Sequence, residues 1–190
     1  TVVVVVLASY AAFSYWKDYQ RKQAVEASTL YAEVLKQVAS NDPKRINDAV
    51  AALVEKYSNT AYAPRAQLLA VQTNMQVKDL ARAKSQLEWV IAHASEAGLQ
   101  DTARLKLASI LLDEKNYTEA MKLLEVTHPE AFVGLFSDLK GDVLAAQGKT
   151  EEARTAYKLA FEKTDSKSAY RSLIQLKLDG LGMDEQGGAK

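Results

Sequence analysis

Apolar side chains recur along most of the chain at intervals of three and four residues, which is the period of an amphipathic α-helix. A turn around residues 40–43 interrupts the pattern, and there Asp42 is the expected N-cap and Pro43 the first helical residue. Nothing between residues 17 and 39 breaks a helix, and one apolar face is formed there by Ala27, Tyr31, Val34, Leu35 and Val38. The pattern predicts further helices over residues 43–57, 63–76, 80–94 and 168–178.

The segments 105–127 and 138–160 repeat one another. Ala108 aligns with Gly141 and Ala120 with Ala153, and 33 positions separate the members of each pair. A period near 34 with small residues at such positions resembles the tetratricopeptide repeat (TPR), in which each unit is a pair of antiparallel helices. We expect the small residues where the two helices cross, with larger apolar side chains beside them at Leu111, Leu124, Leu144 and Tyr157.

Short polar turns are predicted inside both repeated segments. Asn116 and Gly148 stand between the helices, where a chain that ends a helix often needs the left-handed backbone region. Thr118 and Thr150 follow them and are the expected N-caps of the second helices.

The whole pattern predicts an all-α fold, because one helix pair cannot bury its apolar face alone and must stack on neighbours. We expect a TPR-like helix-hairpin solenoid of about four units, degenerate in the first, with a C-terminal capping helix. The second unit precedes the third by 37 positions, judged from Ala83 and Ala120, so we place four extra residues in a loop at 95–100. The predicted domains are a partial membrane anchor (1–19), the TPR-like domain (20–179) and a flexible tail (180–190).

The N-terminal segment carries no charge over the fifteen residues from Val2 to Trp16. As a helix they would span about 22 Å, short of the ~20 residues that a bilayer requires. The chain begins with Thr1 and not with Met, so we expect upstream residues, and apolar ones would complete an N-terminal transmembrane helix. Aromatic residues at the end of the segment favour the headgroup region. The anchor is assigned to Val2, Val3, Val4, Val5, Val6, Leu7, Tyr15 and Trp16.

Two other interpretations of this segment stay open. It could be a signal peptide, or a helix buried in the domain or in an oligomer. Lys17, Arg21 and Lys22 follow the segment and mildly oppose placing the remainder of the chain outside the cell, since basic flanks tend to stay in the cytoplasm.

Composition narrows the possible functions. The 24 acidic and 24 basic residues cancel and form no basic stripe, which argues against nucleic acid as a partner. The chain has no cysteine, which excludes disulfides and thiolate chemistry. His93 and His128 are isolated near predicted helix C-termini, and no catalytic or nucleotide-binding motif occurs. We therefore expect no enzyme, no catalytic residues, no cofactor, no metal and no small-molecule substrate.

The order of segments resembles one family more closely. Residues 80–90 (LARAKSQLEWV), residues 139–149 (LKGDVLAAQGK) and the run from Ile174 to Asp179 are similar to the YfgM family of bacterial inner-membrane proteins. The resemblance implies an ancillary subunit of the SecYEG translocon, located in the bacterial inner membrane and anchored by one N-terminal helix. It also implies a TPR domain in the periplasm that works with the chaperone PpiD on exported clients.

The first helix of each unit lines the concave surface of a TPR array, so this face is the candidate partner-binding site. The lysine and asparagine clamp with which some TPRs grip acidic chaperone tails is absent, because Gln72, Ser109 and Asp142 stand at the matching positions. Packing against neighbouring helices is the alternative role for the apolar members. The predicted surface comprises Arg65, Leu68, Gln72, Met75, Thr102, Leu105, Ser109, Leu112, Leu135, Asp138 and Asp142.

Two functions are compatible with these features. The first is a membrane-anchored periplasmic scaffold at the Sec translocon that binds a chaperone or exported clients. The second is a soluble or processed TPR protein-assembly factor without membrane anchoring. Membrane fractionation would separate them, because an anchored protein stays with membranes in high salt and carbonate.

Overall fold

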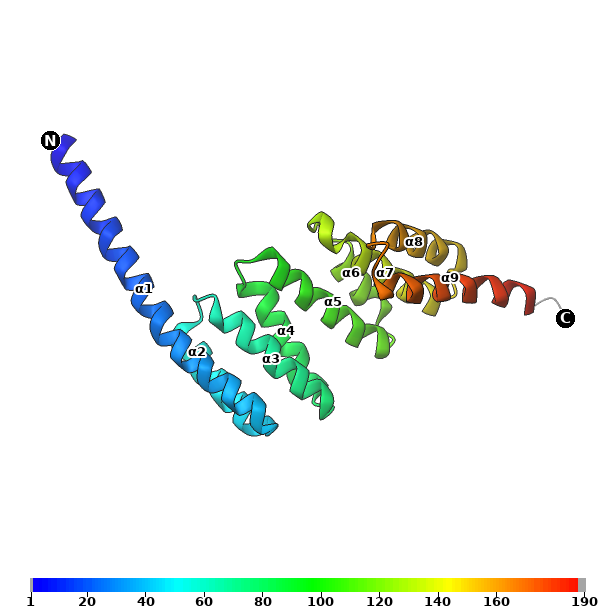
Figure 1. Cartoon of the computed structure of the whole chain (residues 1–190), viewed down its shortest axis with the longest axis horizontal. Coiled ribbons are helices and arrows are strands. Elements are labelled where there is room, and N and C mark those ends of the chain that lie inside the picture. Colours follow the sequence, from blue (N-terminus) through cyan, green and yellow to red (C-terminus); the bar gives the residue numbers. More distant parts are fainter. Residues whose placement is uncertain (1, 188–190) are drawn as a thin grey trace. The chain divides into compact units, whose positions relative to one another are not determined.

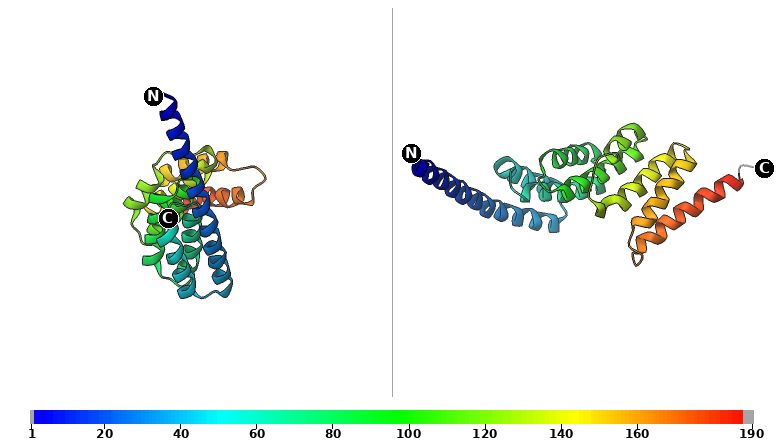
Figure 2. Two further views of the ribbon diagram at one scale, coloured as in Figure 1. Left: turned by 90° about the vertical axis from the view of Figure 1, so that its left-hand side faces the viewer. Right: turned by 90° about the horizontal axis from the view of Figure 1, so that it is seen from above.

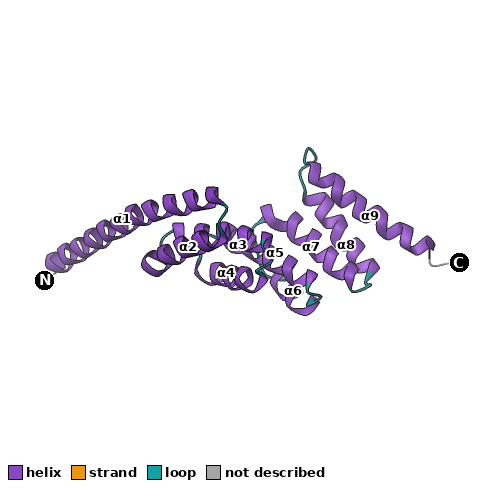
Figure 3. Cartoon of the chain, turned by 90° about the horizontal axis from the view of Figure 1, so that it is seen from below, coloured by secondary structure: helices purple, strands orange, loops and turns teal. Residues whose placement is uncertain are grey.

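The structure is a computed structural model that describes residues 2–187. Over these residues the chain is helical and contains no strand (Figures 1 and 3). The helices are α1 (Val2–Ser40), α2 (Pro43–Tyr57), α3 (Tyr62–Gln76), α4 (Leu80–His93), α5 (Ala97–Asp113), α6 (Tyr117–Leu124), the short 3-10 helix η1 (Glu130–Phe132), α7 (Val133–Ala146), α8 (Thr150–Lys163) and α9 (Ala169–Gly187).

The chain divides into two compact bodies, which we call the N-terminal body (residues 1–95) and the C-terminal body (residues 96–190). The N-terminal body contains the helix pairs α1–α2 and α3–α4, and α3 also contacts α1 and α2. The C-terminal body contains the pairs α5–α6 and α7–α8, and α9 packs on α8. The predicted all-α arrangement of helix pairs followed by a last helix is therefore present.

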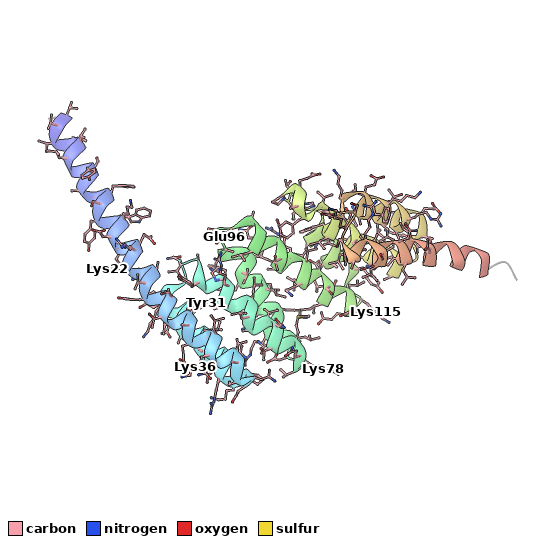
Figure 4. All side chains as sticks on the ribbon, in the orientation of Figure 1. Lys22, Tyr31, Lys36, Lys78, Glu96 and Lys115 are labelled. Carbon is pink, nitrogen blue, oxygen red and sulfur yellow. The ribbon has the colours of Figure 1, made fainter. Side chains whose placement is uncertain are left out.

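Every helix pair is joined by the same turn. A residue in the left-handed region follows the first helix, with φ values of 53° at Asn41, 62° at Lys78, 60° at Lys115 and 75° at Gly148. Figure 4 shows Lys78 and Lys115 at the tips of their turns. The next residue in each case is the N-cap of the second helix, namely Asp42, Asp79, Asn116 and Lys149.

This turn confirms part of the sequence prediction and corrects the rest. Asp42 caps α2 by accepting hydrogen bonds from the backbone N–H groups of Lys44 and Arg45, and Pro43 is the first helical residue. Thr118 and Thr150 are not N-caps, because both already lie inside helices. Asn116 is not left-handed either, since its φ is −86°. In that turn the left-handed position falls one residue earlier, at Lys115, directly after the first helix, where it satisfies the free carbonyl groups of that helix, whereas Gly148 is left-handed as predicted.

The shorter spacing of the last repeat arises in α6. This helix has 8 residues, whereas the other second helices α2, α4 and α8 have 15, 14 and 14. The expected loop at 95–100 is wrong, because α5 already begins at Ala97 behind the extended N-cap residue Glu96. The β-branched pair at 126–127 and Pro129 follow the end of α6, and these residue types disfavour helix.

An apolar cluster joins α1, α2 and α3 in the N-terminal body. Val34 of α1 packs with Ile46, Val50 and Leu53 of α2, and all four side chains are buried. Three alanines of α3, which are wholly buried, bring α3 close to this cluster: Ala63, Ala66 and Ala70. Beside it, the rings of Tyr31 and Tyr62 lie with their centroids 5.4 Å apart, and Figure 4 shows Tyr31 where α1 faces α3.

A triad of amides, buried at Asn47 and Asn74 and half-buried at Gln86, fastens α2, α3 and α4 to one another. Asn47 and Asn74 exchange two hydrogen bonds of 2.9 and 3.0 Å, and Gln86 bonds both residues at 3.0 and 2.8 Å. Asn47 also donates to the Pro43 carbonyl at 2.8 Å. Because each amide finds partners in the others, the triad fixes how the three helices align without a large penalty for burial.

In the C-terminal body the small residues stand at the helix crossings, as predicted. Ala108, Ala120 and Ala153 are wholly buried, and Gly141 is buried as well. A Cβ atom at Gly141 would lie 2.5 Å from two ring carbons of Tyr157, so only glycine allows this ring to lie between α7 and α8. Small residues therefore set the spacing of both pairs.

The last helix is longer than the predicted 168–178. α9 runs from Ala169 to Gly187 and packs on α8 through Ile174, which is wholly buried. Residues 180–187 of the predicted tail thus belong to α9, and residues 188–190 lie outside the described part of the chain.

Candidate partner-binding surface

The predicted surface residues fall in both bodies, and each group lies along one first helix. On α3, Gln72 is exposed and Arg65, Leu68 and Met75 are half-buried. The Arg65 guanidinium donates to the Ala61 carbonyl at 2.6 Å, which holds it along its own helix. α3 thus leaves both apolar and polar atoms of these residues accessible.

The α5 group is half-buried throughout. Leu105 and Leu112 pack partly against the apolar cluster of Ala108, Ala120 and Leu124, and the rest of each side chain reaches solvent. Thr102 donates to the Gly98 carbonyl at 2.7 Å. Each of these leucines therefore packs on the core and also keeps accessible surface.

The α7 group differs, because α9 covers part of it. Asp138 is only 2% exposed and lies in the interior instead of on an accessible surface. Its Oδ2 atom accepts hydrogen bonds from the Tyr170 hydroxyl at 2.5 Å and from the Lys177 ammonium at 2.7 Å, and both donors belong to α9. Leu135 is the exposed member of the group.

Asp142 belongs to the same charged cluster. It accepts a hydrogen bond from the Tyr157 hydroxyl at 2.7 Å and is paired with Lys177 at 2.8 Å. The Lys177 ammonium also lies 5.5 Å from the centre of the Tyr157 ring, in cation–π distance. One lysine of α9 thus bridges two carboxylates of α7 and fixes the last helix over the fourth pair.

The cluster raises the pKa of both of its tyrosines. Burial raises the pKa of Tyr157 and of Tyr170 well above the usual value for tyrosine, and hydrogen bonding to Asp142 and Asp138 raises each further. Both tyrosines are therefore hydrogen-bond donors at physiological pH. The Oδ1 atom of Asp138 is buried and has no partner within residues 2–187.

Sequence reasoning missed this cluster. Tyr170 and Lys177 lie 32 and 39 positions from Asp138, beyond the range of any local helix pattern. The available signal was a single lysine inside the apolar run of residues 173–178, which is unusual for a face that packs against a core.

The two histidines make aromatic contacts. His93 stacks on Trp89 with 4.4 Å between ring centres, and its Nδ1 atom lies 2.8 Å from the Trp89 carbonyl oxygen. His128 stacks on Phe136 at 4.2 Å. Across residues 2–187 no group of three or more histidines, cysteines and carboxylates is placed to hold a metal ion.

The first turns of α1 form a second accessible surface. Within the N-terminal body this half of α1 extends beyond α2, α3 and α4 (Figures 1 and 2). Its apolar side chains stand in the open, with exposed fractions of 77% at Val2 and Tyr15 and 56% at Trp16. None of the helices that the structure describes has an apolar stretch of the length needed to cross a bilayer.

The helix pairs, their shared turns and the small residues at the crossings define the class of the protein. A family model described as the Tetratricopeptide repeat-like domain matches residues 1–183. The chain belongs to this family.

The chain is also similar to individual proteins over nearly its whole length. The chain is 29% identical over 181 residues to a protein of Neisseria gonorrhoeae (strain ATCC 700825 / FA 1090), covering 95% of the chain and 87% of the relative. It is 26% identical over 181 residues to a protein of Escherichia coli (strain K12), covering 95% and 86%. A protein of Aggregatibacter actinomycetemcomitans is 25% identical over 178 residues, covering 94% and 86%. All three relatives are named ancillary SecYEG translocon subunit.

These relatives confirm the resemblance that the sequence suggested. No solved structure matches the chain. A repeat-like helical scaffold with relatives of this name indicates a role in protein interaction and not in catalysis.

Proposed function

We propose that the protein is a membrane-anchored scaffold of the bacterial Sec translocon, with its helix pairs in the periplasm, that binds a periplasmic chaperone or exported clients. The observation that carries the proposal is the name shared by relatives that align with nearly the whole chain. The helix-pair architecture supports it, because stacked pairs offer extended surfaces for other proteins.

The exposed end of α1 supports the anchor. Residues 2–16 present valines, a leucine and aromatic rings to solvent over several turns, which is unfavourable in water by about 25 cal/mol per Å² of apolar surface. Phe13 and Trp16 lie with ring centres 6.2 Å apart toward the end of this stretch. Aromatic rings at that place match the headgroup region of a bilayer, and burial in lipid would remove the apolar surface from water.

The accessible parts of the first helices support partner binding. Leu68 and Met75 in the N-terminal body, and Leu105 and Leu112 in the C-terminal body, present apolar atoms next to polar ones. This mixture suits an apolar segment of an unfolded or helical client. Asp138 takes no direct part, since α9 engages it, and Asp142 contributes only its accessible edge.

Membrane fractionation of the full chain tests the anchor. Val4→Lys with Leu7→Lys should move the protein from carbonate-washed bacterial membranes to the soluble fraction, because each lysine within the bilayer costs about 2.5–3.5 kcal/mol. Val25→Lys is the matched control, since Val25 is 61% exposed on the same helix but lies beyond residues 2–16. It should leave the distribution unchanged.

The outcome separates the two candidate functions. Wild-type protein that stays in carbonate-washed membranes and co-purifies with SecY in mild detergent supports the anchored scaffold. Wild-type protein that leaves the membranes in carbonate would contradict the anchor and favour the soluble assembly factor. Membrane retention without SecY would contradict the association with the translocon.

A further inference from the structure

The short α6 leaves the C-terminal body incomplete on one side. Second helices elsewhere in the chain run for 14 or 15 residues, whereas α6 ends after 8. The difference of at least six residues corresponds to nearly two helical turns, or about 9 Å of helix. The chain instead turns away through residues 125–129 to η1, where His128 stacks on Phe136.

The end of α6 lies beside the groove between α7 and α8. Met121 packs against the apolar cluster that contains Leu144, Ala153 and Ala156. One turn later, the Glu125 carboxylate reaches the Lys140 ammonium of α7 at 3.8 Å. These contacts place the last turn of α6 along the α7–α8 pair, so a longer α6 would continue over the same groove.

A cavity of about 350 Å³ is present at this place. Ala156 and Leu144 line its apolar part together with Leu159, which is 41% exposed. Lys140 of α7 and Glu152 of α8 stand on its walls with opposite charges. The remaining lining residues are Ser137 and Thr155.

We propose that this groove, which we call the α7–α8 groove, binds a short amphipathic helix of a partner protein in the place that further turns of α6 would take. The repeat itself indicates a helix as the occupant, because in the N-terminal body the second half of α2 packs through Val50 and Leu53 on the alanines of α3 in the next pair. The charges define its chemistry further. The partner helix carries an apolar stripe for Leu144, Ala156 and Leu159, a basic residue for Glu152 and an acidic residue that shares Lys140 with Glu125.

This surface is distinct from the one on the first helices. On α7, Ser137, Lys140 and Leu144 follow one another at intervals of three and four and share one face. Leu135, Asp138 and Asp142 follow the same intervals on another face of the helix. The proposal therefore does not depend on association with the translocon or on partner binding by the first helices.

The chain supplies a suitable probe. A synthetic peptide with the sequence of residues 80–93 copies α4, a complete second helix with an apolar stripe and with Lys84 and Glu88 one turn apart. A fluorescein-labelled peptide, held helical by a hydrocarbon staple on its polar side, is titrated with the full chain and followed by anisotropy. We expect saturable binding at micromolar to submillimolar concentration.

Variants locate the site. Leu159→Glu should weaken binding at least tenfold, and Thr155→Arg, at an exposed position on the same wall, is a second variant that keeps the test valid if the first unfolds. Leu135→Glu is the matched control, because Leu135 is also 41% exposed but lies on the other face of α7. The Lys140→Glu variant should bind the original peptide more weakly than the wild type does. It should bind more tightly to a peptide in which Lys replaces Glu88.

Several results would overturn the proposal. These are no saturable binding by wild type, equal binding by the Leu159→Glu and wild-type proteins, or an equal loss with Leu135→Glu. A peptide with a central proline that binds as tightly would identify an extended segment as the occupant. Self-association of the chain that Leu159→Glu abolishes would identify a second copy instead. If the peptide, fitted with a photo-crosslinker, labels only the N-terminal body, it has instead taken the place of α4.

Discussion

The contact between Gly141 and Tyr157 makes a quantitative prediction about Gly141→Ala. A Cβ atom at this position would lie 2.5 Å from Cδ1 and Cε1 of Tyr157 and 3.0 Å from Cγ. The ring cannot easily move away, because it is buried and its hydroxyl is bonded to Asp142 at 2.7 Å. The substitution must therefore push α7 and α8 apart or break that hydrogen bond.

The magnitude follows from two opposing effects. Forcing a methyl group into a packed core costs about 1–3 kcal/mol. Replacing glycine by alanine inside a helix gains about 1 kcal/mol. We expect Gly141→Ala to lower the free energy of unfolding by about 1 kcal/mol, measured as a lower urea midpoint at constant m-value.

Two further variants identify the cause. Gly98→Ala lies in α5 of the same body, where the nearest atoms of Phe132 would be 3.8 Å away, so it should cause no loss and could gain up to ~1 kcal/mol. Tyr157→Leu combined with Gly141→Ala recreates the pairing of Ala108 with Leu124 in the preceding repeat. In that background Gly141→Ala should become neutral or stabilising. An equal loss in both backgrounds, or a gain in the wild type, would refute the close approach.

Three other predictions concern stability. Asn74→Leu should lower the free energy of unfolding of the N-terminal body by about 1–3 kcal/mol, because it removes three of the four hydrogen bonds within the amide triad, and thermal unfolding beside the exposed control Gln72→Leu measures this. Asp42→Ala should cost about 1 kcal/mol through loss of the α2 N-cap, and a mutant that melts with the wild type would show that the cap is dispensable. The raised pKa of Tyr157 and of Tyr170 means that their contribution to stability is complete below pH ~10 and is lost as the pH rises further, because the unfolded state then releases these protons first. Absorbance at 295 nm should show both ionising only on unfolding, and a double Tyr→Phe variant with an unchanged alkaline stability profile would contradict the assignment.

Local chemistry made much of the fold predictable. The small residues Ala108, Ala120, Gly141 and Ala153 mark helix crossings because backbone approach depends on side-chain size at a fixed period. Asp42 was readable as a cap because its side chain acts within its own turn. Features encoded within one turn or by the period of the repeat could therefore be recognised without the structure.

Long-range contacts could not be predicted from the sequence. The burial of Asp138 depends on Tyr170 and Lys177 of α9, which no periodicity links to α7. The left-handed φ of 60° at Lys115 was missed because lysine carries no preference for that region, and the fold imposes it at the same place in each turn. The short length of α6 was missed because the amphipathic pattern of its residues gives no sign of where the helix ends. The open α7–α8 groove could therefore not be predicted.

The role of α9 follows from the same cluster. It buries Ile174 against α8 and holds two carboxylates of α7 through one lysine, so it closes the last pair through both apolar and charged contacts. This confines the accessible part of the α7 face to Leu135 and the edge of Asp142. Partner binding by first helices in the C-terminal body should therefore centre on α5.

Site-specific photo-crosslinking from Leu105 in intact bacterial membranes, with mass spectrometry of the adducts, tests the proposed scaffold most directly. Leu105 is half-buried on the predicted face of α5, and Glu119 of α6 is the exposed control in the same body. The account predicts adducts with translocon subunits, a periplasmic chaperone or exported clients from Leu105 and not from Glu119. Such adducts from Glu119 alone, or from neither position in protein that remains in the membrane, would contradict it.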